Sequence, residues 1–243
     1  MMFNTSKCHM LHLGNANKRF EYVMGGQVLD TVESEKDVEV MVHQSLKPSL
    51  QCTRAAEKAY QVLGQLSRGI TFRDKQTFLK LYKVYVRPNL EYAVASWNPW
   101  LEADKEMLEK VHRRAINMVS NFQSRNYRDK LLEAGLTTLE ERRKRGDLIY
   151  MYRIMTGKDD VHHSTWFQKM SDREGGANTR AAAGYLNVLP PDNCNNDTRR
   201  NFFSQRVVDS WNSLPDRVKQ AETVNQFKNS LDDHLQAWGG HPR

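Results

Sequence analysis

The spacing of the apolar residues changes at Pro48, and this change constrains the fold more than any other feature of the sequence. Before Pro48, short runs alternate apolar and polar residues, as strands with one buried face do. After Pro48, apolar residues recur every three or four positions, which is typical of amphipathic helices. We therefore expect a mainly α chain (α+β class), in which a short N-terminal β segment precedes a helical bundle and C-terminal helices.

The N-terminal segment predicts short strands. Residues 20–24 (FEYVM) and 27–29 (QVL) flank Gly25 and Gly26, and two glycines supply the positive φ angles of a tight hairpin turn. Residues 38–42 (VEVMV) predict a third strand. Three short strands without helical cover make a poor independent fold. We therefore expect this segment to belong to a larger sheet.

The helical part divides at recognisable start and stop signals. Thr71 or Asp74 can cap a second helix, which Pro88 should break. A long helix is expected from about Glu102, and a short helix should end at Gly135. A capping box beginning at Thr137 (TTLE) predicts the helix after that. The apolar residues expected on the buried faces include Ala55, Ala59, Leu63, Phe78, Leu81, Tyr82, Tyr85, Leu108, Val111, Leu148, Tyr152, Phe203, Val207, Trp211, Val224, Phe227, Leu231, Leu235 and Trp238.

These patterns predict four parts along the chain. Residues 1–47 form the β segment and residues 48–170 a helical bundle. Residues 171–198 are rich in Gly, Asn, Asp, Ala and Pro, which predicts a mobile linker. Residues 199–243 return to helical periodicity.

The composition favours an intracellular protein of the cytoplasm or nucleus that is neither secreted nor in a membrane. Three scattered cysteines, Cys8, Cys52 and Cys194, indicate neither a disulfide framework nor a zinc site. Charged and polar side chains interrupt the start of the chain, unlike a signal peptide. No stretch approaches the roughly 18 apolar residues of a membrane-spanning helix.

The net charge of +7 favours an anionic partner, and RNA or an RNA–DNA duplex is the one we expect. Residues 105–145 hold eleven Lys and Arg against six Asp and Glu, which is +5 of that total. A solvated face with local ion pairs is the alternative interpretation. We also considered Trp97 and Trp100 for stacking on bases. The candidate phosphate-binding residues are Lys105, Lys110, Arg113, Arg114, Arg142, Arg143, Lys144 and Arg145.

No sequence motif for catalysis is present. The chain has no GxxxxGK[ST], GxGxxG, HExxH or GxSxG motif. The chain has two pairs of adjacent carboxylates. Asp159–Asp160 follows the expected end of a helix, and Asp232–Asp233 lies on the polar face of another helix. A two-metal nucleotidyl transferase needs its carboxylates on a strand–turn–strand. We therefore expect no catalytic residue, metal or cofactor in this chain.

Several runs, in the same order along the chain, resemble the end of the palm, the thumb and the C-terminal region of non-LTR (LINE-type, Jockey/CR1-like) retrotransposon reverse transcriptases. As a set they are specific, whereas any single run is weak. They are residues 7–14 (KCHMLHLG), 35–38 (EKDV), 46–49 (LKPS), 81–92 (LYKVYVRPNLEY), 97–99 (WNP), 108–115 (LEKVHRRA), 139–148 (LEERRKRGDL), 201–208 (NFFSQRVV) and 211–215 (WNSLP).

The resemblance implies an RNA-directed DNA polymerase whose endonuclease, fingers and catalytic palm with its (F/Y)ADD motif precede a segment like this one. Lys7 resembles the general-acid lysine of such polymerases, and the hairpin at Gly25 and Gly26 resembles their primer grip. Mg²⁺ is implied only for a full-length polymerase. The sequence departs from the family at Glu39, where glycine is usual, which puts a close backbone approach there in doubt.

The expected function is therefore non-specific binding to the backbone of RNA or of an RNA–DNA duplex, without polymerase activity in this chain alone. Two alternatives remain open. The chain can be a non-functional transcribed relic, or a helical protein-interaction module whose C-terminal helices bind a partner.

Overall fold

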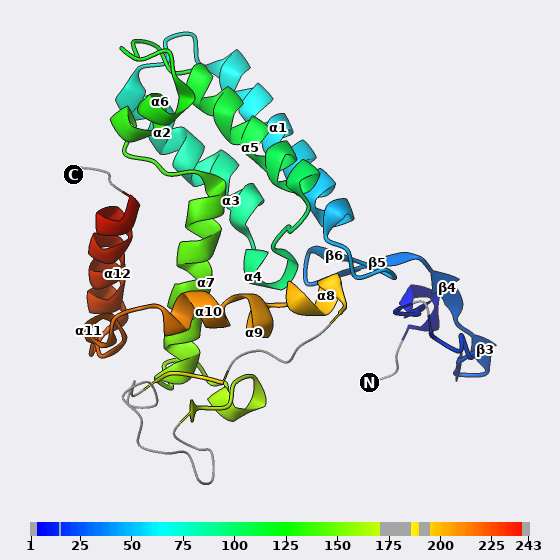
Figure 1. The fold of residues 1–243 in the computed structure, drawn as a ribbon. Coiled ribbons are helices and arrows are strands. Elements are labelled where there is room, and N and C mark those ends of the chain that lie inside the picture. The colour runs from blue at the N-terminus through cyan, green and yellow to red at the C-terminus, as the bar shows by residue number, and fades with distance from the viewer. Residues whose placement is uncertain (1–3, 15, 171–185, 190–194, 240–243) are drawn as a thin grey trace. The chain divides into compact units, whose positions relative to one another are not determined.

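The computed structural model of the chain is mainly helical, with small two-stranded sheets near the N-terminus (Figure 1). It describes residues 4–14, 16–170, 186–189 and 195–239. The chain divides into two compact units, Met1–Leu139 and Glu140–Arg243. No helix in the described ranges is long and apolar enough to cross a bilayer.

The N-terminal residues form paired short strands. A 3₁₀ turn, η1 (Thr5–Lys7), leads into β1 (His9–Leu11), which pairs in parallel with β4 (Asp30–Val32). Between them, β2 (Val23–Met24) and β3 (Gln27–Val28) form an antiparallel hairpin. Gly25 and Gly26 form its turn with φ angles of 59° and 82°, which confirms the turn predicted from the two glycines.

The strand predicted at residues 38–42 is wrong at its start, because the observed strand begins only at Val40. Strand β5 (Ser34–Asp37) pairs antiparallel with β6 (Val40–His43), and Val38 and Glu39 form the turn between them. Both turn residues have positive φ, 43° and 65°. Alternation of residue types persists through residues 38–42, but the backbone reverses after Asp37. Glu39 thus occupies a backbone position that glycine fills without strain.

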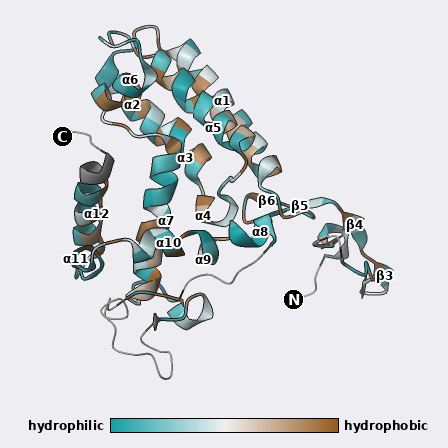
Figure 2. Cartoon of the chain, in the orientation of Figure 1, coloured by the Kyte–Doolittle hydropathy of each residue, from teal (hydrophilic) through white to brown (hydrophobic). Residues whose placement is uncertain are grey.

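The core of the first unit lies mainly between α1 (Ser49–Gly69) and α5 (Glu102–Asn117). Along both helices hydrophilic residues alternate with hydrophobic ones (Figure 2), as expected for helices with one buried face. The buried residues include Cys52, Ala55, Ala59, Leu63, Phe78, Tyr82, Leu108, Val111 and Ala115. One polar pair lies among them, because the buried Tyr82 hydroxyl is hydrogen-bonded to Nδ1 of the buried His112.

The expected break at Pro88 takes a different form. Helix α2 (Lys75–Leu81) begins at Asp74, whose carboxylate accepts a hydrogen bond from the Thr77 amide at 2.9 Å. A π-helical segment, η2 (Tyr82–Val86), follows, and Pro88 lies in the first turn of α3 (Arg87–Glu91). Proline has no N–H and crowds the preceding turn, and the wider π turn before it lets the chain stay helical.

The first unit ends with shorter elements. Helix α4 (Val94–Trp97) precedes α5. Helix α6 (Tyr127–Glu133) ends two residues before Gly135, whose φ of 60° is consistent with the helix stop predicted there. Helix α7 (Leu139–Met155) starts one residue later than the Thr137 capping box predicts. The amide of Leu139 donates to Glu109 Oε2 at 3.0 Å, so a carboxylate from α5 contacts this helix start.

The second unit packs α7 with the C-terminal helices. These are α8 (Asp197–Arg200), α9 (Phe203–Arg206), α10 (Val208–Asn212), α11 (Asp216–Lys219) and α12 (Val224–Gly239). A 3₁₀ turn, η3 (His163–Thr165), follows α7. Tyr152 stacks on Phe227 with ring centroids 4.2 Å apart. Most of the predicted core residues of this unit are buried, namely Leu148, Tyr152, Phe203, Val207, Trp211, Phe227 and Leu231, whereas Leu235 is 37% exposed, so its predicted burial was wrong.

The predicted linker falls mostly outside the described residues. Within it, residues 186–189 do not behave as a linker, because Leu186 and Val188 are buried. Val188 bridges to Lys169, and Trp211 Nε1 donates to the Leu186 carbonyl at 2.8 Å. The division between the two compact units falls after Leu139, inside the predicted 48–170 bundle, and the predicted boundaries at 47 and 198 stay predictions.

Candidate nucleic-acid interface

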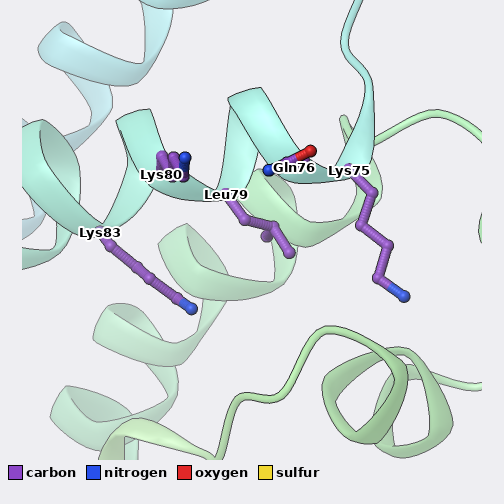
Figure 3. Close-up of a pocket in the computed structure, with 5 residues that line it drawn as sticks. All are labelled: Lys75, Gln76, Leu79, Lys80 and Lys83. Carbon is purple, nitrogen blue, oxygen red and sulfur yellow. The ribbon is translucent and has the colours of Figure 1, made fainter.

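Three lysines line a pocket on α2 and η2. Lys75, Lys80 and Lys83 surround it together with Gln76 and Leu79 (Figure 3). Lys75 and Lys83 extend to the same side of the helix with Leu79 between them. The opposite side of these turns is the buried one, with Phe78 and Tyr82 in the core. Gln76 and Lys80 are four residues apart, and Lys80 and Lys83 are three apart. This helical spacing places them on the side opposite the core.

The pocket lining contains three lysines and no carboxylate, although Arg87 nearby in the sequence is paired with Glu91 at 3.6 Å. Residues 72–90 contain five cationic side chains and a single carboxylate, that of Asp74. The backbone hydrogen bond from Thr77 lowers the pKa of Asp74, and this carboxylate serves as the helix cap. Lys75 forms a long ion pair with Glu133, in which Nζ and Oε1 are 3.6 Å apart. Lys80 and Lys83 form no ion pair within the described parts of the chain. We call these three residues the lysine face.

Some of the cations predicted to bind phosphate on α5 form ion pairs with neighbouring carboxylates. Lys105 forms an ion pair with Glu102 at 2.7 Å. Arg113 donates to both carboxylate oxygens of Glu106, at 2.9 and 3.3 Å, and this hydrogen bonding raises the pKa of the Arg113 guanidinium. Lys110 and Arg114 are exposed. The structure thus leaves Lys110 and Arg114 as the accessible cations of this group.

The dense run at residues 142–145 does not form a single exposed face. Arg143 is only 4% exposed. Arg145 donates to both oxygens of Asp232 on α12, at 2.5 and 2.8 Å. Lys144 is exposed and Arg142 is half-buried. Because Arg143 is buried, we leave it out of the candidate interface. The α5 cations and this run belong to different compact units, so their predicted common surface stays a prediction.

The two tryptophans considered for base stacking differ in environment. Trp97 is 4% exposed, and its Nε1 donates to the Tyr92 carbonyl at 2.8 Å. It is therefore a core residue, and the stacking role proposed for it from the sequence is corrected. Trp100 is half-buried. Of the tyrosines, Tyr85 is 55% exposed and directly follows the lysine face in η2.

The residues matched to polymerase roles lie at the N-terminal end. Lys7 is the last residue of η1 and is exposed. The η1 turn contacts the glycine hairpin, because the Thr5 hydroxyl donates to Gln27 Oε1 at 3.0 Å. Gly25 lies against the same turn, and a Cβ there would come within 3.3 Å of Thr5 Cγ2. The structure therefore brings the neighbourhoods of Lys7, Gly25 and Gly26 together.

The adjacent carboxylates have cationic partners. Asp159 forms an ion pair with Arg153, and Asp232 forms the one with Arg145 described above. Among the residues that the structure describes, no cluster of three or more His, Cys, Asp or Glu side chains is arranged to hold a metal ion. The ammonium groups of the lysine face can bind anionic oxygens.

The lysine face was missed in the sequence interpretation, which used residues 78–86 only for their apolar side. The signal was present in the sequence. Five cations against one capping carboxylate, with Lys80 and Lys83 three residues apart, indicate a cationic helix face.

Comparison with known proteins gives one distant partial match. No protein-family model and no solved structure matches the chain. An uncharacterized protein of Caenorhabditis elegans is 25% identical over 125 residues, which is 50% of this chain and 63% of that protein. The chain is thus similar to less than two thirds of the relative's length, and the relative's name assigns no activity.

Proposed function

We propose that the chain corresponds to the thumb and C-terminal region of a non-LTR retrotransposon reverse transcriptase, and that it binds the backbone of RNA or of an RNA–DNA duplex without sequence specificity. The lysine face carries this proposal, because Lys75, Lys80 and Lys83 line one pocket and two of them lack a carboxylate partner in the described chain. A phosphate oxygen supplies the missing negative charge.

The shape of the lysine face favours an extended polyanion over a small anion. Lys83 lies eight positions after Lys75, and a rise of about 1.5 Å per residue spreads the cations over about 12 Å. A nucleic-acid strand offers phosphates at regular intervals along such a distance. The exposed ring of Tyr85 adds a surface on which a base can stack. Neither contact reads base edges, so the binding is non-specific.

The alternative of a protein-interaction module has less support. It requires the apolar faces of the C-terminal helices to be open to a partner. Phe203, Trp211, Phe227 and Leu231 are already buried within the second unit.

Salt-dependent binding to RNA tests the proposed interface. Fluorescence anisotropy with a labelled single strand and an RNA–DNA duplex is measured between 50 and 200 mM salt, where phosphate contacts weaken steeply. The double variant Lys80→Gln/Lys83→Gln should bind more weakly, with a slope of log K against log salt that is smaller by about 2. Lys18→Gln/Lys158→Gln removes the same charge from exposed lysines elsewhere and should change little. Equal losses in both variants would refute the proposed interface.

Primer extension tests the activity of the chain. The purified chain with Mg²⁺, primer–template and deoxynucleotides should incorporate nothing, because a two-metal reaction needs carboxylates on a strand–turn–strand. Robust incorporation would overturn this part of the proposal.

A further inference from the structure

A second recess lies between α1 and the end of α5. Tyr60, Leu63, Gly64 and Ser67 line it from α1, and Arg114 and Met118 line it from the other side. Leu63 and Gly64 form an apolar patch at its floor, and Ser67 and Arg114 add polar atoms to the lining. A Cβ at Gly64 would meet only Arg68 Nη1, at 3.8 Å, so the space above this glycine is open. The recess can therefore accept a small apolar side chain.

The charged side chains at the rim of the recess are all positive. Residues 58–73 and 110–128, which include both of its walls, contain no Asp or Glu. Arg68 and Arg114 are exposed, and the described residues provide no carboxylate to either of them. The guanidinium of Arg114 lies 5.7 Å from the centre of the Tyr60 ring, which leaves its donors available at the rim. Glu57 is the nearest carboxylate in sequence and lies about one helical turn before the recess.

The complementary feature is the hairpin formed by β5 and β6. Residues 30–39 contain five carboxylates and one lysine, although the whole chain has a net charge of +7. At the hairpin tip, Val38 is 75% exposed and stands between the exposed Asp37 and Glu39. The tip thus presents an apolar side chain flanked by carboxylates, whereas the recess is an apolar floor flanked by guanidinium groups.

The tip is held in a defined conformation. The Tyr92 hydroxyl donates to the Val38 carbonyl at 3.2 Å, and Lys36 donates to Glu39 Oε1 at 2.8 Å. Val38 therefore stays exposed instead of packing against its own chain. A rigid apolar tip loses little conformational entropy on binding, which favours association. Within one copy the tip lies against Tyr92, at the junction of α3 and α4, rather than at the recess.

We propose that the hairpin tip of one copy of this chain binds the α1–α5 recess of a second copy. Val38 inserts against Leu63 and Gly64, while the tip carboxylates face Arg68 and Arg114. The contact joins two different surfaces, so it is heterologous and leaves one free tip and one free recess in each pair. A nucleic-acid backbone would satisfy the rim charges but has no apolar group for the floor, so the recess fits the tip better.

A mixing experiment with the full chain tests this contact. One variant, Asp37→Lys/Glu39→Lys, has a disabled tip, and another, Arg68→Gln/Arg114→Gln, has a disabled recess. Sedimentation velocity should show that the unmodified chain self-associates with increasing concentration. Each variant alone should associate at least about tenfold more weakly, because each lacks the complementary charge at one of the two surfaces. The disabled-tip variant keeps the unmodified recess, and the disabled-recess variant keeps the unmodified tip. These two unmodified surfaces have complementary charges.

An equimolar mixture of the two variants should therefore form a 1:1 heterodimer through one intact contact. Raising the salt from 0.1 to 1 M should weaken it, because the Debye length falls from about 10 to 3 Å. Circular dichroism checks that both variants are folded, and Lys18→Gln/Lys158→Gln should self-associate like the unmodified chain. A monomeric unmodified chain at all concentrations, or a mixture without a heterodimer, would overturn the proposal. So would a recess variant that loses RNA binding while its self-association is unchanged, because the rim would then belong to the nucleic-acid surface.

Discussion

Arg206 donates hydrogen bonds from Nε and Nη2 to the two carboxylate oxygens of Asp147, each at 2.9 Å. The two side chains are only 15% and 8% exposed. This pair connects α9 to α7 across 59 positions of sequence. It also joins residues 139–148 and 201–208, two of the runs on which the proposed relationship to retrotransposon reverse transcriptases depends. The resemblance in these runs therefore includes residues that hold the second unit together.

Removing one partner of this pair should destabilise the second unit. In Asp147→Ala the Arg206 guanidinium keeps its buried position without the carboxylate, and the free energy of unfolding should fall by about 3 to 5 kcal/mol. Urea denaturation followed by tryptophan fluorescence measures this change. The control is Arg200→Ala, because the Arg200–Asp197 pair is exposed and should contribute about 0 to 1 kcal/mol. Equally small losses in both variants would contradict the structural role of the Asp147–Arg206 pair.

Replacing Glu39 by glycine should stabilise the first unit. Glu39 has a φ of 65°, and the left-handed conformation costs a non-glycine residue roughly 1 to 2 kcal/mol. Glu39→Gly also removes the exposed ion pair with Lys36, which is worth little. We expect the melting temperature to rise by about 2 to 4 °C per kcal/mol gained. In the opposite direction, Gly26→Ala should lower it, because Gly26 has a φ of 82°. A lower melting temperature for Glu39→Gly would count against this account of the turn.

Alkaline pH should weaken the first unit through Tyr127. Burial, together with the hydrogen bond that its hydroxyl donates to Glu109 Oε1 at 2.5 Å, raises the pKa of Tyr127. In the unfolded chain a tyrosine ionises near pH 10. The stabilisation is therefore complete below about pH 10 and falls as the pH rises further, where only the unfolded state loses the proton.

The variant Tyr127→Phe separates this contribution from others. Between pH 10 and 11 the unmodified chain should lose up to about 1.4 kcal/mol more of its unfolding free energy than Tyr127→Phe does. Denaturation curves at pH 8, 10 and 11 provide the measurement. Tyr85→Phe changes a ring that is 55% exposed and serves as the matched control. Identical pH profiles for Tyr127→Phe and the unmodified chain would show that ionisation of Tyr127 does not contribute to the pH dependence of the unfolding free energy.

Trp97 and Trp100 should respond differently to substitution. Trp97→Phe removes the hydrogen bond to the Tyr92 carbonyl and leaves a gap in the core, so we expect a loss of about 1 to 3 kcal/mol in stability. RNA affinity should be unchanged in the folded variant. If Trp100 stacks on a base, Trp100→Ala should instead weaken RNA binding by about 1 to 3 kcal/mol. Anisotropy and thermal unfolding on both variants separate the two roles, and weaker RNA binding by folded Trp97→Phe would contradict the burial of Trp97.

The amino-acid sequence by itself determined the local structure. The change of periodicity at Pro48 predicts the passage from strands to helices, and the apolar faces of α1, α5 and α7 follow from residue spacing. The turn at Gly25 and Gly26 and the helix stop at Gly135 were predicted from their backbone freedom. These features depend on interactions between residues within about four positions of each other. Such interactions are visible in a linear pattern.

Only the tertiary structure decided which charged and aromatic side chains remain accessible. The pattern of residues 142–145 predicted four phosphate-binding cations, but Arg143 is buried and Arg145 forms an ion pair with Asp232, 87 positions away. Trp97 was considered for base stacking from the sequence, but in the folded chain it is 4% exposed. The physical reason is that burial and ion pairing depend on contacts between distant segments. Local periodicity, which reflects only near neighbours, does not specify those contacts.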